Sequence, residues 1–110
     1  MFCVNKDTKP HIVNGHINRK ILSHSGNLMA VEVRFKGPMT DPGIHEHPHE
    51  QIAYVVKGRF EFQVKGEKHL LEAGDSIYFE PNIPHGAVCM DGEGILLDIF
   101  TPRRDDFLKQ

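Results

Sequence analysis

Glycine and proline interrupt this chain at short intervals, and this spacing limits the possible folds more than any other feature of the sequence. Turn residues stand at 14–15, 25–27, 37–38, 41–43, 57–58, 65–67, 73–75, 81–84 and 91–93. No stretch between them shows a helical period over the usual helix length, and residues 105–110 could form a helical turn at most. Short segments between such breaks are typical of strands. The sequence therefore predicts an all-β fold.

The segments between the turns are predicted as strands, at residues 19–24, 28–36, 52–56, 59–65, 68–72, 76–79, 85–90 and 94–100. Most alternate between apolar and polar residues, which indicates strands that bury one face. Segment 52–56 is apolar throughout, so we expect a fully buried strand there, and Lys65-Gly66-Glu67 suggests a tight hairpin. Many short strands favour a small sandwich or barrel, because those folds leave few strand edges exposed.

Length and charge exclude several classes of function. A chain of 110 residues is predicted to form one domain, residues 1–110, with a single core. Its net charge of −2 and the lack of a basic run argue against nucleic-acid binding. No apolar stretch reaches membrane-spanning length, and residues 1–9 lack the apolar segment of a signal peptide. We therefore expect a cytoplasmic protein in which Cys3 and Cys89 stay reduced.

Three histidines stand at alternate positions within residues 45–51, which read His-Glu-His-Pro-His-Glu-Gln. In an extended chain His45, His47 and Gln51 would share one face, because successive side chains alternate between faces. Imidazoles two residues apart can bind one metal ion without backbone strain. Glu50 competes with Gln51 as a ligand, since a carboxylate is the more usual hard ligand, whereas strand parity favours Gln51. The alternative is a histidine-rich surface loop that binds no metal.

A carboxylate interrupts the apolar segment at residues 94–100. Alternation places Leu96, Asp98 and Phe100 on one face, and the opposite face is wholly apolar. Burying a charge destabilises a protein unless the charge is paired. One interpretation is that Asp98 pairs with an arginine, for which the candidates are Arg34, Arg103 and Arg104. The other is that Asp98 acts as a general acid or base in a cavity, with a shifted pKa. The two interpretations are compatible.

The pattern His45-x-His47-x-x-x-Gln51, followed by Gly58, resembles the first motif of the cupin superfamily. The stretch from Gly74-Asp75 to Pro81-x-x-Pro84-His85 resembles the second motif. The resemblance implies a small jelly-roll β-barrel that holds one divalent metal. Its ligands would be His45, His47, Gln51 and His85. Because Gln51 replaces the family's usual carboxylate, the ligand set would be neutral and rich in nitrogen, which suits Zn, Ni, Fe or Cu better than Mg or Ca. Mn is a further candidate for the divalent metal.

Three other positions depart from the second cupin motif. Glu80, Asn82 and Cys89 stand where the family has proline, glycine and asparagine. None of them is a ligand position, so the metal prediction is unaffected. The departures do leave the shape of the loop at residues 80–82 open.

A closer resemblance extends over residues 20–108. Segments 29–33, 45–62 and 97–107 are similar to the KdgF-type cupins of pectin and alginate degradation. Those proteins convert 4,5-unsaturated monouronates, the products of polysaccharide lyases, into linear 4-deoxy-5-keto uronates. The resemblance includes the pattern Asp-x-Phe-x-x-x-Arg, which is intact here. It implies that Asp98 shuttles protons, that Phe100 walls the substrate pocket and that Arg104 pairs with the substrate anion.

Two other functions stay open at this point. A cupin that holds iron could act as an oxygenase, and a cupin could bind a sugar or a metal without catalysis. Because cupins often pair, the resemblance also implies a homodimer. A small anionic sugar is the other partner that we expect.

Overall fold

The computed structural model describes residues 1–109 of the chain, and its regular elements are nearly all strands. These are β1 (His11–Ile12), β2 (Ile17–His24), β3 (Met29–Lys36), β4 (Glu50–Lys57), β5 (Arg59–Val64), β6 (Glu67–Glu72), β7 (Ser76–Phe79), β8 (His85–Cys89) and β9 (Glu93–Thr101). A 3-10 turn, η1 (Asn5–Asp7), precedes them, and a short helix, α1 (Asp105–Leu108), follows. No helix in this part of the chain is long and apolar enough to cross a membrane. The predicted all-β fold is confirmed.

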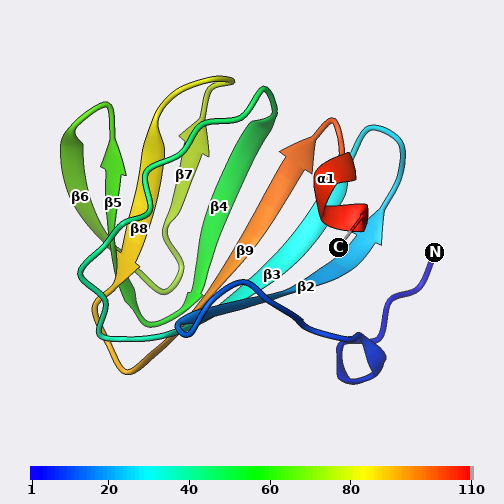
Figure 1. Ribbon diagram of the computed structural model, residues 1–110, viewed down its shortest axis with the longest axis horizontal. Coiled ribbons are helices and arrows are strands. Elements are labelled where there is room, and N and C mark those ends of the chain that lie inside the picture. Colours follow the sequence, from blue (N-terminus) through cyan, green and yellow to red (C-terminus); the bar gives the residue numbers. More distant parts are fainter. Residues whose placement is uncertain (110) are drawn as a thin grey trace.

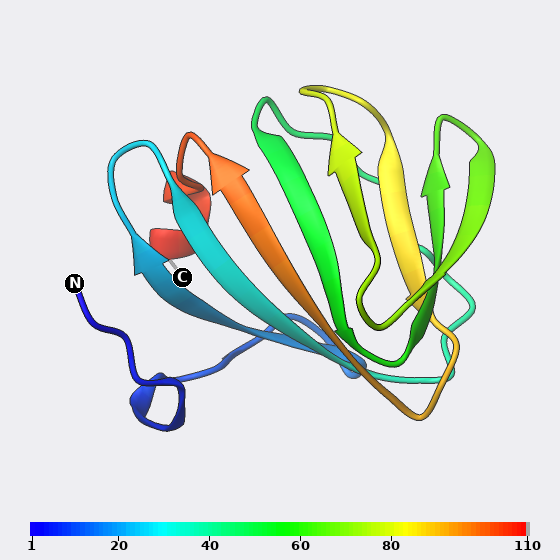
Figure 2. The same ribbon diagram turned by 180° about the vertical axis from the view of Figure 1, so that it is seen from behind.

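The strands form two antiparallel sheets. Six strands pair in the order β1-β2-β3-β9-β4-β7, and three pair in the order β6-β5-β8. Figure 1 and Figure 2 show the sheets converging at one end and spreading at the other, where α1 lies beside the end of β9. No ladder within residues 1–109 joins the two sheets, and an isolated bridge pairs His45, in the segment before β4, with His85 of β8. A closed barrel is therefore not confirmed.

Every predicted strand is present, and no strand end is displaced by more than two residues. The hairpin between β5 and β6 is also confirmed, because Lys65 and Gly66 have φ values of 50° and 82°, as a tight two-residue turn requires. Sequence patterning did not reveal β1 or η1, since neither element buries a side chain. Cys3 is exposed, Cys89 is buried, and the two do not form a disulfide.

Two apolar clusters fix the position of β9. Phe60 is fully buried at the centre of the larger cluster and meets Phe35 edge-on at a centroid distance of 4.9 Å. The smaller cluster consists of Met29, Val31 and Phe100, with Phe107 of α1 packed against it. Strand β9 supplies Leu96 to the larger cluster and Phe100 to the smaller one. Asp98 stands between these two residues in sequence and is thereby held on the inner side of the sheet.

The prediction that residues 52–56 are buried on both faces is wrong. Ala53 and Val55 are buried against the core, whereas Ile52, Tyr54 and Val56 are 43–48% exposed. The reason is the position of β4, whose outer side faces away from the three-stranded sheet and is covered by no other element in residues 1–109. Tyr78 on the neighbouring strand β7 lies beside Ile52 and is also exposed. We call these four residues (Ile52, Tyr54, Val56 and Tyr78) the outer apolar face.

Candidate metal centre

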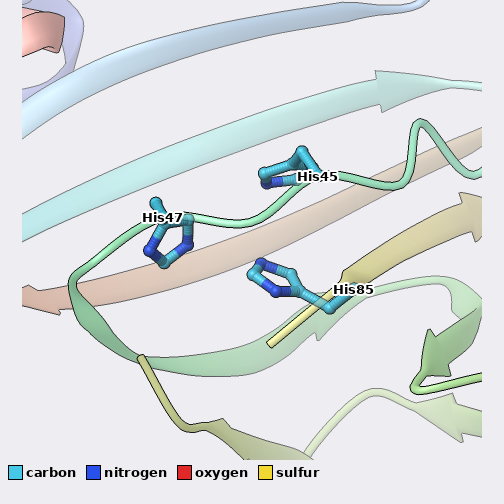
Figure 3. Close-up of side chains that lie close together, drawn as sticks. All are labelled: His45, His47 and His85. Atoms are coloured by element: carbon cyan, nitrogen blue, oxygen red, sulfur yellow. The ribbon is translucent and has the colours of Figure 1, made fainter. Parts of the chain in front are cut away.

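Three histidines from two distant parts of the chain lie together. The rings of His45, His47 and His85 are turned toward a common space, two of them from the segment before β4 and one from the start of β8 (Figure 3). One ring nitrogen from each lies within 4.8 Å of those of the other two. His47 and His85 are buried, while His45 is exposed. The spacing of these nitrogens suits a single metal ion bound by three imidazoles.

Backbone pairing brings His45 to His85. The amide of each donates to the carbonyl of the other, with N···O distances of 3.0 Å and 2.9 Å. The next residue, Gly86, allows the segment before His45 to lie against β8, because a Cβ on Gly86 would stand 2.3 Å from the carbonyl oxygen of Pro42. Only a residue without a side chain fits there. The sequence therefore sets the distance between two predicted ligands through a glycine that is not itself a ligand.

Asn82 helps to position His47. The backbone N–H of Asn82 donates a hydrogen bond to the backbone carbonyl of His47 at 2.7 Å. Asn82 has a φ of 60°, in the left-handed region that asparagine tolerates better than most residues. Asparagine can therefore stand at this position in place of the family's usual glycine. The sequence left the shape of the loop at residues 80–82 open, and the φ of Asn82 shows how this loop accommodates a residue other than glycine.

Two of the rings are oriented by backbone carbonyls. The Nδ1 atom of His45 lies 2.8 Å from the carbonyl of Gly43, and that of His85 lies 2.7 Å from the carbonyl of Ile83. A bond at Nδ1 fixes the ring and directs Nε2 toward the cluster, as in many metal-binding histidines. The Nε2 atom of His85 and the Nδ1 atom of His47 are buried without a hydrogen-bond partner within residues 1–109. Buried polar atoms in that state fit a site that binds a metal ion.

Burial keeps two of the histidines neutral. It lowers the pKa of His85 to about 4, and the neighbouring His45 and His47 contribute to the decrease. Burial also lowers the pKa of His47, although a hydrogen bond with Gln51 opposes the change. Neutral imidazole is the form that binds a metal. The electrostatics of the cluster thus agree with its geometry.

Gln51 and Glu50 lie on opposite sides of β4, as strand parity predicts. Gln51 is 8% exposed, and its Oε1 atom lies 3.0 Å from Nε2 of His47. Glu50 is exposed and accepts a hydrogen bond from the hydroxyl of Tyr78. The predicted segment from His45 to Gln51 is not one continuous strand, because β4 begins only at Glu50. The amide is nevertheless the side chain that reaches the histidines.

Asp98 lies on the inner face of the six-stranded sheet and forms no ion pair within residues 1–109. Its register partners are Val31 on β3 and Ala53 on β4, and its Oδ1 atom is buried with no hydrogen-bond partner within residues 1–109. Burial raises the pKa of Asp98 to about 7, while hydrogen bonding by Gln51 and the charge of Arg104 oppose the rise.

The predicted ion pair of Asp98 with an arginine is not present in the described part of the chain. Each candidate arginine pairs with another carboxylate: Arg34 with Glu32, Arg103 with Asp105 and Arg104 with Asp106.

A cavity of about 410 Å³ connects the histidines with the other predicted site residues. His45, His85 and Gln51 line it, and so do Asp98, Phe100 and Arg104. The side chain of Arg104 is 13% exposed, and its guanidinium donates to Asp106 at 2.8 Å and 3.0 Å. Arg103 is more exposed, at 38%, and does not line the cavity. Between the two arginines left open by the sequence, Arg104 is the one beside the cavity.

Arg19 is a charged residue of this cavity that was not predicted from the sequence. It lies on β2, lines the same cavity and places its guanidinium carbon 3.7 Å from the ring centroid of Phe107. A signal was available in the pattern Ile17-x-Arg19-x-Ile21, which puts a cation on the apolar side of a strand.

Comparison with known proteins places these features in context. Residues 32–100 match the cupin domain family. The chain is 45% identical over 94 residues to the pectin degradation protein KdgF of Dickeya dadantii, and the match covers 84% of both chains. The fold is similar to KdgF from Halomonas sp., with a TM-score of 0.91, 39% identity and 97% of each chain covered. It is also similar to an RmlC-like cupin from Shewanella frigidimarina, with a TM-score of 0.89, 39% identity, and 96% of this chain and 94% of that one covered.

Proposed function

The chain belongs to the cupin domain family, and from that premise we propose that it is a metal-dependent enzyme converting 4,5-unsaturated monouronates into linear 4-deoxy-5-keto uronates. The observation that carries the proposal is the 45% identity to a protein named for pectin degradation, over 84% of the chain. The cavity supports it, because His45, His85, Asp98 and Arg104 line it and its volume of about 410 Å³ suits a small sugar.

His45, His47 and His85, with Gln51 as a fourth ligand, would hold one divalent transition metal. The fit rests on the three converging ring nitrogens and on the two buried nitrogens that lack a partner in residues 1–109. Imidazole ligation suits Zn, Ni or Fe, and Mn is a further candidate. When bound, such an ion supplies a Lewis acid that stabilises negative charge developing on substrate oxygens.

The reaction is an isomerisation that needs a group able to move protons. The C1 hydroxyl loses its proton, the bond between C1 and the ring oxygen breaks, and a proton is added at C4. The product carries an aldehyde at C1 and a ketone at C5. Asp98 lines the cavity, and its Oδ1 atom is buried. Its pKa of about 7 suits a group that accepts and donates protons near neutral pH.

Two neighbouring residues would position the sugar. Arg104 presents a guanidinium fork, which matches a carboxylate in shape and charge, and Asp106 holds that fork in place. The ring of Phe100 lies 5.6 Å from that of His47, between centroids, and is 2% exposed. It would form an apolar wall that keeps the substrate beside the histidines.

The ultraviolet band of the conjugated C4=C5 bond gives a direct test. Metal-loaded protein added to an unsaturated galacturonate should accelerate the loss of this band, and His47→Ala should lose both metal and activity. Asp98→Asn should retain metal and lose turnover by about 10²- to 10⁴-fold. Retained metal in His47→Ala would contradict the ligand assignment, and unchanged turnover in Asp98→Asn would contradict the proton-transfer role.

Absence of acceleration by a sample with confirmed metal would instead favour an oxygenase or a binding protein. Oxygen consumption with a candidate substrate separates these two. The closed jelly-roll barrel, the cytoplasmic location and the homodimer stay proposals by analogy with the family.

A further inference from the structure

Phe107 attaches the short helix α1 to the core. None of the residues of α1 is fully buried, but the side chain of Phe107 packs against the cluster of Met29, Val31 and Phe100. Its ring is nearly perpendicular to that of Phe100, at a centroid distance of 5.7 Å. A helix of one turn is not stable by itself, so its position depends on such packing. Phe107 also lines the cavity, which its attachment to the core does not require.

Two guanidinium groups lie against the ring of Phe107. The guanidinium carbons of Arg19 and Arg104 lie 3.7 Å and 4.1 Å from its centroid. Both carbons are therefore over a face of the ring, because an approach from the edge would leave them beyond about 5 Å. On the same face they would be within about 4 Å of each other, which leaves no room for two planar guanidinium groups. The two groups thus occupy opposite faces, and the ring separates their positive charges.

Arg104 has a second neighbour in Asp106, which does not line the cavity. The carboxylate of Asp106 accepts hydrogen bonds from Nε and Nη2 of Arg104, and its side chain is 55% exposed, so water screens this ion pair. The Nη1 atom of Arg104 forms no hydrogen bond within residues 1–109. The ring of Phe100 lies farther from this guanidinium, at 5.2 Å. Phe107 is therefore the cavity-lining residue in closest contact with it, and N–H donors stay free for a ligand.

We propose that Phe107 is a positioning residue, whose ring holds the guanidinium of Arg104 at the cavity wall so that it pairs with the carboxylate of an anionic sugar. An aromatic face attracts a guanidinium without using any of its N–H donors. A second carboxylate at this place would instead compete with the sugar for those donors. The ring fixes the cation before the sugar arrives, which reduces the entropy lost on binding. The inference rests on the proposed function, which supplies the anionic sugar.

Binding of D-galacturonate and D-galactose tests this role without turnover, because the two sugars differ in having a carboxylate or a hydroxymethyl group at C6. Calorimetry with the Zn-loaded protein should show a preference for galacturonate. Phe107→Leu should reduce that preference by about 5-fold, because leucine keeps an apolar contact but has no aromatic face, and Phe107→Tyr should retain it. Leu108→Ala, at a 39% exposed position of the same helix, is the matched control and should bind both sugars as the unchanged protein does.

A double variant shows whether Phe107 acts through Arg104. Arg104→Gln alone should remove most of the preference for galacturonate, and Phe107→Leu added to it should change the remaining preference by less than about 2-fold. Independent, additive losses would contradict the proposal. With an unsaturated galacturonate as substrate, Phe107→Leu should raise KM by about 5-fold and change kcat less. Competition with a chelator should show an unchanged Zn affinity.

The positioning role is overturned if the unchanged protein shows no preference for galacturonate, or if Phe107→Leu keeps that preference or loses affinity for both sugars equally. It is also overturned if Phe107→Tyr loses as much as Phe107→Leu. Should Phe107→Leu not fold, Phe107→Met carries the same prediction, since it too fills the site without an aromatic face. The proposed reaction fails separately. If the ultraviolet band does not decay while Phe107→Leu loses the preference and Phe107→Tyr keeps it, the positioning role stands and the reaction does not.

Discussion

Gly86→Ala should separate the two halves of the metal centre without changing any predicted ligand. The added Cβ would lie 2.3 Å from the carbonyl oxygen of Pro42, whereas ordinary van der Waals contact begins at 3.4 Å. The segment before His45 must therefore move away from β8 by about 1 Å. This movement is steric in origin, because the φ of Gly86 lies outside the left-handed region.

The expected magnitude follows from the contacts that such a movement breaks. The reciprocal amide–carbonyl bonds between His45 and His85, at 3.0 Å and 2.9 Å, hold this segment to β8, and the amide of Ala87 donates to Pro42 at 3.2 Å. Loss of these bonds and overpacking should lower the free energy of unfolding by about 1–3 kcal/mol. Metal–ligand distances tolerate only about 0.2 Å. Displacement of His45 by about 1 Å should therefore weaken metal binding by about 100-fold.

Competition with a chromophoric chelator measures the Zn affinity, and urea unfolding followed by circular dichroism measures the stability. Gly26→Ala is the matched control, because no atom lies within 4 Å of the position of its added Cβ. The control should bind Zn and unfold as the unchanged protein does. A Gly86→Ala variant with unchanged Zn affinity and stability would refute the argument that contact with β8 sets the position of His45.

Three further predictions concern the core, an ion pair and the outer apolar face. Phe60→Ala should lower the free energy of unfolding by about 3–5 kcal/mol in urea titrations, since Phe60 is fully buried; a loss below 1 kcal/mol would contradict its central place. Hydrogen bonds and charge from Arg59 lower the pKa of Asp91, so this ion pair stabilises the fold at neutral pH and is lost as the pH falls through that lowered pKa. Thermal melts should therefore show that Asp91→Asn loses less stability in acid than the unchanged protein does, and an identical acid profile for the two would contradict this. If two copies pair through the outer apolar face, light scattering should show that Ile52→Glu is monomeric. Leu70→Glu, at an exposed position on β6, is the control and should stay dimeric; a dimer in both variants would place the interface elsewhere.

Local patterns predicted the strands well because strand signals are local. Turn residues and alternation lie within a few neighbouring positions, so β3 and β7 could be located from their own residues. The exposure of Ile52 and Tyr54 could not be predicted in this way. An apolar run shows that a strand is suited to burial, but the elements that cover its faces come from distant segments. Strand β4 is flanked by β9 and β7, and neither of them covers its outer side.

The candidate site likewise combines residues that local patterns could predict with residues that only the fold brings together. His45 and His47 are close in sequence, so their shared direction could be inferred from spacing alone. His85 was predicted as a ligand only because its segment resembles a known motif, since no local pattern relates it to residues 45–47. Arg19 was missed because its significance depends on Phe107 and on the cavity, which only the fold brings together. A charged residue at an inward strand position is the local signal that would have identified it.

Gln51 contacts both the histidine cluster and Asp98, the residue that we propose transfers protons, and its amide offers a reason why this position need not hold the family's carboxylate. Its oxygen lies 3.0 Å from Nε2 of His47, while hydrogen bonding by the same side chain acts on Asp98. A glutamate of equal size would have no N–H to offer Asp98 when ionised, and it would place a second carboxylate beside the first. It would also reduce the positive charge that Arg19 and Arg104 bring to the cavity. A neutral amide therefore suits the proposed reaction: it leaves the electrostatic field of the cavity favourable to an anionic sugar, and it leaves Asp98 as the carboxyl group that we propose exchanges protons.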